Sequence, residues 1–198
     1  EWAADMARFA SEDAARPPPR GAVLFIGSSS IRLWKTLAED FPGVAVINRG
    51  FGGSEIRDST WYADRIVVPY KPRLIVFYAG DNDIASGRSP QQLHDDFLAF
   101  VRRVRRDLPS VPIAFVSCKP SPSRAHLLDA QRAANALIRA EAAKQKRVAF
   151  VDVFTPMLDA NGQPRAELFI EDRLHMNAAG YAIWRDAIAP YLQPGAFR

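Results

Sequence analysis

Short runs of consecutive apolar residues alternate along the chain with longer segments in which apolar residues recur every three or four positions. The short runs are rich in Val, Ile and Phe, as in parallel strands that are buried on both faces of a sheet. The longer segments have the spacing of helices that bury one side. The predicted strands are Ala22–Ile26, Val44–Ile47, Leu74–Tyr78, Ile113–Ser117 and Val148–Val151, and the predicted helices are Ile31–Glu39, Glu55–Arg65, Pro90–Arg106, Ser123–Lys144 and Ala178–Tyr191.

Regular alternation of strands and helices predicts an α/β fold, because right-handed crossovers place helices on both faces of a parallel sheet. We therefore expect a three-layer α/β/α sandwich in a single domain that spans residues 1–198. Residues 1–20 are expected to pack on its outside as a helix, Trp2–Ala15, and a proline-rich linker, Pro17–Pro19. Ligands of such sheets bind at the carboxyl ends of the strands, so reactive residues are expected just after the strands.

Four polar, turn-rich clusters meet this expectation. Gly27–Ser30 follows the first predicted strand and opens a helix, Gly50–Ser54 follows the second, and Gly80–Asp83 follows the third. Asp172–His175 comes after the fifth strand and before the last predicted helix, for which Asn177 is the expected N-cap. The four clusters are therefore expected to converge on one rim of the sheet.

Of the three histidines, only His175 has a carboxylate three residues upstream in a loop. His94 and His126 lie within helical patterns, as surface or partly buried helix residues do. Histidine can accept a serine proton near neutral pH, and a carboxylate can hold the imidazole ring and stabilise its protonated form. Asp172 and His175 are thus candidates for the base of an acyl-transfer reaction. A structural Asp–His pair that only fixes a loop would have the same spacing.

Three serines, Ser28, Ser29 and Ser30, occupy the strand-to-helix turn, where a nucleophilic hydroxyl would be exposed to substrate. The chemistry of the residues does not choose among them, and at least one is expected to cap the helix. A tetrahedral intermediate also needs hydrogen-bond donors for its oxyanion. The backbone N–H groups of Ser29 and Gly53 and the side-chain amide of Asn82 are the candidates.

In order along the chain, the four clusters resemble signature blocks of the SGNH (GDSL-type) hydrolases. Phe25–Ile31 resembles the first block, with Ser29 in the nucleophile position, and Asn48–Gly53 resembles the second, whose last glycine supplies an oxyanion N–H. Gly80–Asp83 is similar to the third block, a Gly-x-Asn-Asp motif, and Asp172–His175 to the Asp-x-x-His block. The resemblance extends over Ala22 to Tyr191 and includes the typical residues Asn177, Gly180 and Tyr181.

The resemblance implies a flavodoxin-like sheet of five parallel strands and a carboxylic ester hydrolase that works through an acyl-enzyme. It implies no metal and no other cofactor. It assigns Ser29, His175 and Asp172 to a catalytic triad, and Ser29, Gly53 and Asn82 to the oxyanion hole.

One position departs from the family pattern, since the Gly-Asp-Ser of the family name is here Gly27-Ser28-Ser29. The replaced aspartate is not a triad member, so the departure affects local hydrogen bonding and substrate inference rather than the reaction. The chain has no Gly-x-Ser-x-Gly pentapeptide, which argues against the nucleophile elbow of α/β-hydrolases.

A short-acyl, acetyl-type substrate is the expectation for this chain, which has no long insertion resembling a lipase lid. Phe51, Ile84 and Met176 are the side chains near the motifs that could line an acyl pocket; ordinary core packing would explain each of them equally well. Sugar esters, aryl esters, thioesters and lysophospholipids all stay open as substrates.

Two other functions fit part of the pattern. A metal-dependent phosphoesterase would use oxygen-rich ligands, which suit Mg²⁺ or Mn²⁺, but it leaves Ser29 and Gly53 without roles. A binding module could keep the fold without catalysis. The ligand set of the phosphoesterase would be Asp81, Asp83, Asp152, Asp172 and His175.

Composition and charge limit the classes of partner expected for the protein. The 198 residues carry a net charge of +4 and 24% charged side chains, as in ordinary globular proteins, and no apolar run approaches the ~20 residues of a membrane span. The densest basic run, Arg102–Arg106, lies on one face of a predicted helix, which indicates a solvated face rather than a nucleic-acid site. We expect a small-molecule ester as the partner and no nucleic acid; the oligomeric state stays open.

Two further observations bear on compartment and redox chemistry. The single cysteine, Cys118, excludes an internal disulfide and lies in an apolar run, as a buried structural thiol does. The sequence begins at Glu1 rather than Met, which slightly favours a secreted or periplasmic protein over a cytoplasmic one.

Overall fold

The computed structural model describes residues 1–197 and contains a sheet of five strands in the order β2-β1-β3-β4-β5. Every neighbouring pair is parallel, so the three polar clusters that directly follow β1, β2 and β3 leave the sheet at the same edge. The predicted α/β fold class and the five parallel strands are confirmed. The strands are β1 (Val23–Gly27), β2 (Val46–Gly50), β3 (Leu74–Tyr78), β4 (Ile113–Val116) and β5 (Val148–Val151).

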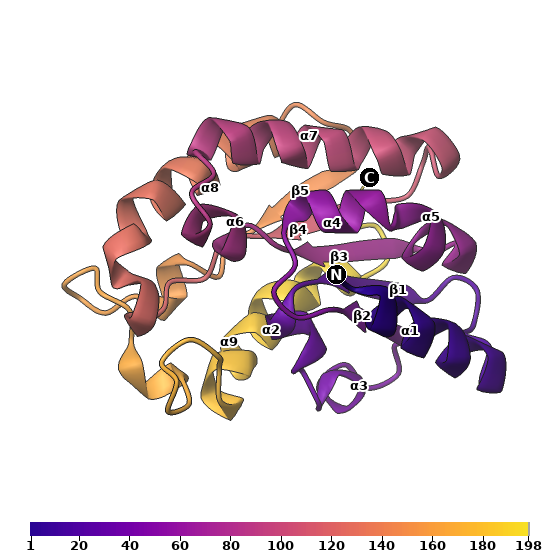
Figure 1. Cartoon of the computed structure of the whole chain (residues 1–198), viewed down its shortest axis with the longest axis horizontal. Helices are drawn as coiled ribbons and strands as arrows, with labels where there is room; N and C mark the ends of the chain where they lie inside the picture. The colour runs from indigo at the N-terminus through magenta and orange to yellow at the C-terminus, as the bar shows by residue number, and fades with distance from the viewer. Residues whose placement is uncertain (198) are drawn as a thin grey trace.

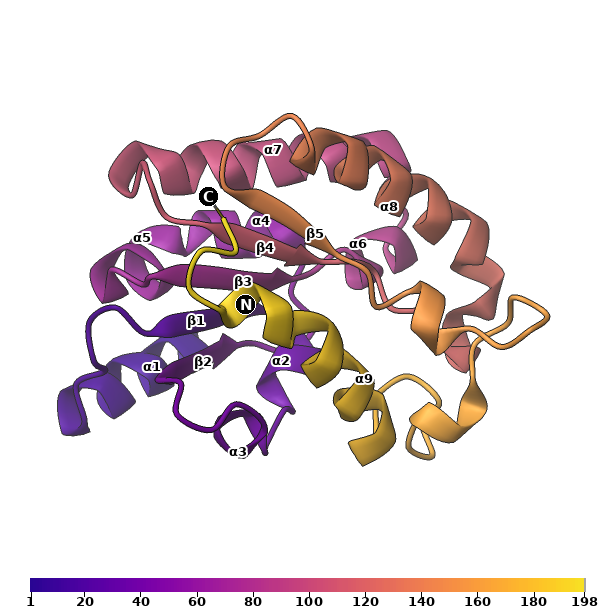
Figure 2. The same ribbon diagram turned by 180° about the vertical axis from the view of Figure 1, so that it is seen from behind.

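Helices cover both faces of the sheet, as the two opposite views show (Figures 1 and 2). Alternate side chains of β1 point into two separate cores, with Leu24 and Ile26 in one and Val23 and Phe25 in the other. The first core is closed by α4 (Ile56–Trp61), α5 (Ala63–Ile66), α7 (Pro90–Asp107) and α8 (Leu128–Ala142), and the second by α2 (Ser29–Arg32), α3 (Leu37–Asp40) and α9 (Ala178–Ile188).

Several predicted helices are shorter or divided. The helix predicted at Ile31–Glu39 is wrong as one unit, because the buried Trp34, whose indole donates to Asp40 at 2.6 Å, holds a turn between α2 and α3. The helix predicted at Ala178–Tyr191 ends at Ile188 and continues as a 3-10 turn, since Pro190 has no N–H to donate.

Two more predicted helices are also divided, and one helix lies outside every prediction. The segment Glu55–Arg65 breaks at Tyr62, between α4 and α5. The segment predicted at Ser123–Lys144 begins as a 3-10 turn, Pro122–Leu127, because Arg124 has non-helical backbone angles. The five-residue helix α6 (Asp81–Ala85) is too short to show a periodic pattern.

Helix α1 (Ala3–Ala15), predicted as Trp2–Ala15, packs beside the β2 edge of the sheet. Its buried Met6 and Phe9 join the first core. A polar network adds a second attachment: Arg49 of β2 forms an ion pair with Asp13 and donates to the Tyr70 hydroxyl at 2.7 Å. Because Arg49 is buried, losing its partner would leave an uncompensated charge, so the network fixes where α1 lies.

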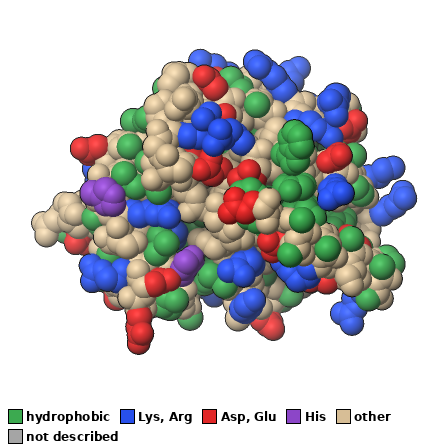
Figure 3. Space-filling view, viewed as in Figure 1, with side chains coloured by type: hydrophobic (Ala, Val, Ile, Leu, Met, Phe, Trp, Pro, Cys, Tyr) green, Lys and Arg blue, Asp and Glu red, His purple; other side chains and the backbone are tan. Residues whose placement is uncertain are grey.

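The surface shows mixed charge on the face seen in Figure 3, where basic and acidic side chains are interspersed. Within residues 1–197, no helix combines the length and the apolar character that crossing a bilayer requires.

Candidate active site

Ser29 is the first residue of α2, directly after the strand β1. The tight turn before it depends on Gly27, whose φ of +138° is a conformation that other residues rarely adopt. Ser28 and Ser30 on either side are buried, whereas Ser29 is partly exposed. Of the three serines that residue chemistry left open, Ser29 is therefore the one whose side chain is accessible from solvent.

His175 and Asp172 reach Ser29 from the loop before α9. The Ser29 Oγ lies 3.0 Å from His175 Nε2, and His175 Nδ1 lies 2.5 Å from Asp172 Oδ2. The other oxygen of Asp172 accepts hydrogen bonds from the backbone N–H groups of Leu174 and His175, both at 2.9 Å. The three side chains therefore form one continuous chain of hydrogen bonds across 146 residues of sequence.

Asp172 is held in its ionised form, which can accept a hydrogen bond from the His175 ring. Desolvation acts to raise the pKa of Asp172, but hydrogen bonds from the His175 ring and from two backbone N–H groups outweigh it and lower that pKa to about 2. Asp172 is consequently a carboxylate throughout the neutral range. It can hold the Nδ1–H tautomer of His175, which leaves Nε2 as the acceptor for the Ser29 hydroxyl.

Three potential oxyanion donors line the same depression as Ser29 and His175. Gly53 has a φ of +76° and follows β2, and Asn82 lies in α6 after β3. Among residues 1–197, the backbone N–H groups of Ser29 and Gly53 have no hydrogen-bond acceptor, and Asn82 Nδ2 donates only to the Ser54 carbonyl, at 3.1 Å. These N–H groups are available to a negatively charged oxygen near Ser29.

The depression is small and polar, with a volume of about 440 Å³. Leu174 is the single large apolar side chain among the residues that line it. Phe51, Ile84 and Met176, which are expected from the sequence to line an acyl pocket, are not among the residues that line this depression. Their side chains turn away into the two cores and are 5% exposed or less, because each fills space between the sheet and its covering helices.

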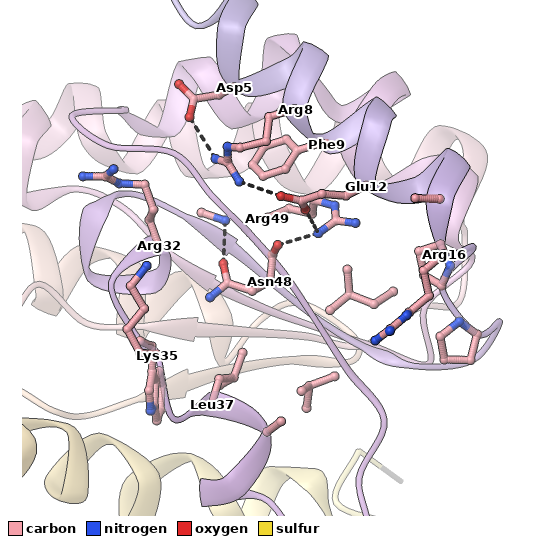
Figure 4. A pocket seen from close by; sticks show the side chains of 18 of the residues that line it. Asp5, Arg8, Phe9, Glu12, Arg16, Arg32, Lys35, Leu37, Asn48 and Arg49 are labelled. Carbon is pink, nitrogen blue, oxygen red and sulfur yellow. Dashed lines mark hydrogen bonds and ion pairs between the residues drawn. The ribbon is translucent and has the colours of Figure 1, made fainter.

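A larger groove of about 930 Å³ continues from this depression between α1 and the edge strand β2 (Figure 4). Asp5 and Arg32 line both the depression and the groove, so these two cavities are adjacent. Arg8 in the groove pairs with Asp5 at 3.0 Å and with Glu12 at 3.2 Å. The groove, which charged and apolar side chains line together, gives a route along which a molecule bound at Ser29 can extend.

The carboxylates of the phosphoesterase alternative are dispersed and already engaged. Asp81 is buried against Lys119 at 3.3 Å and Arg124 at 2.8 Å. Asp83 accepts the Ile56 backbone N–H, and Asp152 accepts backbone N–H groups after β5. In the part of the chain that the structure describes, no three His, Cys, Asp or Glu side chains are grouped so as to hold a metal ion.

We expect Asp83→Asn to remove a pH-dependent loss of stability. Burial raises the pKa of Asp83 to about 7, against about 4 in an unfolded chain. The folded wild type therefore binds this proton more tightly, and this carboxyl lowers the free energy of unfolding as pH rises from about 4 to 7. Asparagine keeps an oxygen for the Ile56 N–H but does not ionise, so the variant gains stability relative to wild type across that window.

Urea unfolding of both proteins at about pH 5 and pH 8 measures this effect. Asp129→Asn, at a fully exposed position, is the matched control and should show no such change. An Asp83→Asn difference that is equal at both pH values would contradict the prediction.

Several residues around the depression have no signal in the sequence. Asp5, Arg32 and Arg124 line it, and the Trp2 indole donates to the Gly52 carbonyl at 2.9 Å. None of them belongs to a motif. The packing of α1, of α2 and of the 3-10 turn before α8 brings them to the depression. A search for motifs at strand ends does not include these elements.

A serine, a histidine and an aspartate joined in series at the carboxyl ends of a parallel sheet is the arrangement of a hydrolase. Residues 13–183 match the model of the GDSL-like lipase/acylhydrolase family, and the chain belongs to that family. The resemblance to SGNH (GDSL-type) hydrolases predicted from the four blocks is thereby confirmed. Family membership assigns the protein to the hydrolases that act on esters.

Solved structures share the fold. A protein assigned as an acylhydrolase from Bacteroides fragilis is 22% identical, with a TM-score of 0.83 over 97% of each chain. A GDSL-like lipase from Bacteroides thetaiotaomicron is 22% identical, with a TM-score of 0.79 over 94% of this chain and 96% of that one.

A variant of an acetyl-xylooligosaccharide esterase from Geobacillus is 15% identical, with a TM-score of 0.70 over 90% of this chain and 97% of that one. At these identities the likeness shows the fold alone. No curated protein matches the chain.

Proposed function

We propose that the protein hydrolyses carboxylic esters of short acyl groups through a covalent acyl-enzyme on Ser29. The observation that carries this proposal is the contact of 3.0 Å between Ser29 Oγ and His175 Nε2, with His175 held by Asp172. A serine hydroxyl becomes an effective nucleophile when such a base takes its proton.

In the first half of the reaction, Ser29 Oγ attacks the acyl carbon while His175 Nε2 takes the hydroxyl proton. The carbonyl oxygen becomes an oxyanion that accepts hydrogen bonds from the N–H groups of Ser29, Gly53 and Asn82. His175 then passes the proton to the alcohol oxygen, the C–O bond breaks, and the alcohol leaves.

In the second half, His175 removes a proton from water, and the resulting hydroxide attacks the acyl carbon of the Ser29 ester. The second oxyanion collapses with departure of Ser29 Oγ, which recovers its proton from His175. The products are a carboxylic acid and an alcohol.

The size and polarity of the depression support the short acyl group. A long acyl chain would have to lie against charged and amide groups, where burying it yields no hydrophobic gain. The alcohol part has more room, because the groove between α1 and β2 opens from the same place. The acetyl esterase among the solved relatives acts on an acetylated oligosaccharide, which is consistent with a short acyl group on a larger polar alcohol.

The test is a series of p-nitrophenyl acetate, butyrate and octanoate, with EDTA present, combined with labelling by a fluorophosphonate. We expect kcat/KM to fall at least about tenfold from acetate to octanoate, since a poorly fitting chain loses that much or more. Mass spectrometry is expected to find the phosphonate on the peptide that contains Ser29.

Two outcomes would sink the proposal. Hydrolysis that stops in EDTA and returns with Mg²⁺ or Mn²⁺ would favour the carboxylate–metal alternative. Binding of esters without any turnover or labelling would favour a binding module.

A further inference from the structure

We propose that Trp2 and Arg124 are positioning residues of the oxyanion hole. Each donates a hydrogen bond to the carbonyl end of an amide whose N–H end lines the depression at Ser29. Trp2 acts on the peptide between Gly52 and Gly53, and Arg124 acts on the side chain of Asn82. The inference rests on the proposed ester hydrolysis and assigns two residues outside the four signature blocks to it.

Trp2 holds the first amide. Its Nε1 donates to the Gly52 carbonyl oxygen at 2.9 Å. The Gly52 carbonyl and the Gly53 N–H belong to the same planar peptide, and the described chain has no cis peptide, so they point in opposite directions. A donor fixed at the carbonyl end therefore sets the direction of the N–H at the other end.

This peptide needs such a clamp because two adjacent glycines form it. Neither residue has a side chain to restrict its backbone, and Gly53 adopts a φ of +76° with nothing within 4 Å of where a Cβ would lie. Trp2 is in turn held edge-to-face against the buried Phe51, with ring centroids 5.7 Å apart. Trp2 precedes the residues that match the family, so α1 brings a contact that the family blocks do not contain.

Arg124 holds the second amide. Its Nη1 donates to Asn82 Oδ1 at 3.0 Å, while Asn82 Nδ2 donates to the Ser54 carbonyl at 3.1 Å. If the Asn82 amide rotated by half a turn, its oxygen would face the oxyanion and repel it. Arg124 opposes this rotation. In the rotated state its guanidinium group would face the NH₂ group of Asn82, and two hydrogen-bond donors cannot bond to each other.

An ion pair with a buried carboxylate keeps Arg124 in place. Its Nη1 lies 2.8 Å from Asp81 Oδ2, and Asp81 also contacts Lys119 at 3.3 Å and Gln131 at 2.9 Å. Asp81 and Lys119 are almost fully buried, so the carboxylate is fixed on several sides. This gives Asp81, which the metal alternative would use as a ligand, a role as the anchor of Arg124.

Both contacts also strengthen the donors electronically. A hydrogen bond accepted at the carbonyl end polarises an amide and makes its N–H more acidic, a cooperative gain of about 10–30% per bond. The gain matters most when the oxyanion carries full charge, so it acts on the transition state more than on the bound ester. Loss of either contact should therefore lower kcat and leave KM nearly unchanged.

Trp2→Phe tests the first contact, since phenylalanine keeps an aromatic ring beside Phe51 but has no N–H. We expect kcat for p-nitrophenyl acetate to fall about 3–10-fold, less than the 10²–10³ expected for losing a donor itself. The matched control is Trp61→Phe, at a side chain that is 79% exposed and does not line the depression, and it should leave kcat at the wild-type value.

Arg124→Met tests the second contact, with a fall in kcat of about 10-fold or more expected because the donor is charged. Arg124→Lys keeps a cationic donor beside Asp81, and it is expected to fold like wild type and to recover part of the activity. In an Asn82→Ala background, Arg124→Lys and Arg124→Met should have equal kcat, since the amide on which Arg124 acts is absent.

The outcomes separate this inference from the proposed function. A wild type that neither hydrolyses esters nor is labelled at Ser29 overturns both. An active, labelled wild type whose Trp2→Phe and Arg124→Met variants keep full kcat overturns this inference alone. The ratio of kcat between Arg124→Lys and Arg124→Met is the second criterion. If this ratio is the same in the wild-type and Asn82→Ala backgrounds, the inference is also overturned, because a purely structural role of Arg124 does not depend on the Asn82 amide.

Discussion

Replacing Ser29 by alanine is expected to lower kcat for p-nitrophenyl acetate by about 10⁴–10⁶-fold, while the protein folds as before. Alanine cannot form the acyl-enzyme, so the remaining rate comes only from the oxyanion donors and from binding. Stability should change little, because the Ser29 hydroxyl is partly exposed and its hydrogen bond to His175 is the single side-chain bond it makes within residues 1–197. Stopped assays with EDTA and thermal unfolding of both proteins measure the two effects.

The neighbouring serine provides a matched control. Ser30 is buried and its Oγ has no hydrogen-bond partner in the described part of the chain, so Ser30→Ala removes a hydroxyl without breaking a bond. That variant should keep wild-type kcat. A Ser29→Ala protein with unchanged kcat, or a Ser30→Ala protein as inactive as it, would refute the assignment of the nucleophile.

Gly27→Ala is expected to cause the largest loss of stability from a single methyl group. A Cβ at this position would lie 1.7 Å from the Tyr78 carbonyl oxygen, which is backbone of β3 and also accepts the Ser28 N–H. The two central strands would have to separate where they support the Ser29 turn. Overpacking and backbone strain each cost about 1–3 kcal/mol, so the free energy of unfolding should fall by about 2–6 kcal/mol.

Gly43→Ala separates the two causes. Gly43 has a φ of +78°, but nothing lies within 4 Å of its would-be Cβ, so this variant tests backbone strain without a clash. Urea unfolding should show a loss of about 1 kcal/mol for Gly43→Ala and a clearly larger one for Gly27→Ala. Equal losses would mean that the approach of β1 to Tyr78 does not constrain the fold.

The strands and the location of the site could be predicted because both are recorded in local sequence. A buried parallel strand must be apolar on both faces, so Val23–Gly27 and Leu74–Tyr78 stand out as continuous apolar runs. Parallel pairing then brings the ends of all strands to one edge, and the clusters at Gly27, Gly50 and Gly80 follow from that. The pairing of Asp172 with His175 is local as well, since only three residues separate them.

Helix boundaries were less predictable, since they depend on contacts distant in sequence. The periodicity of Ile31–Glu39 is that of one helix, yet the burial of Trp34 and its bond to Asp40 divide it. The places of the three residues expected to line an acyl pocket also depend on such contacts. Phe51, Ile84 and Met176 are adjacent to motif residues in sequence, but successive side chains point in different directions, and these three point into the cores.

The amino-acid sequence by itself determined the α/β class, the five parallel strands, the family and the edge of the sheet at which polar residues gather, because periodicity and turn residues are properties of neighbouring positions. Only the tertiary structure decided that Ser29, rather than Ser28 or Ser30, lies within hydrogen-bond reach of His175. It also decided that Trp2 and Arg124 contact the amides beside Ser29. Such contacts depend on how helices pack against the sheet, and no spacing along the chain encodes a distance between elements that meet only after folding.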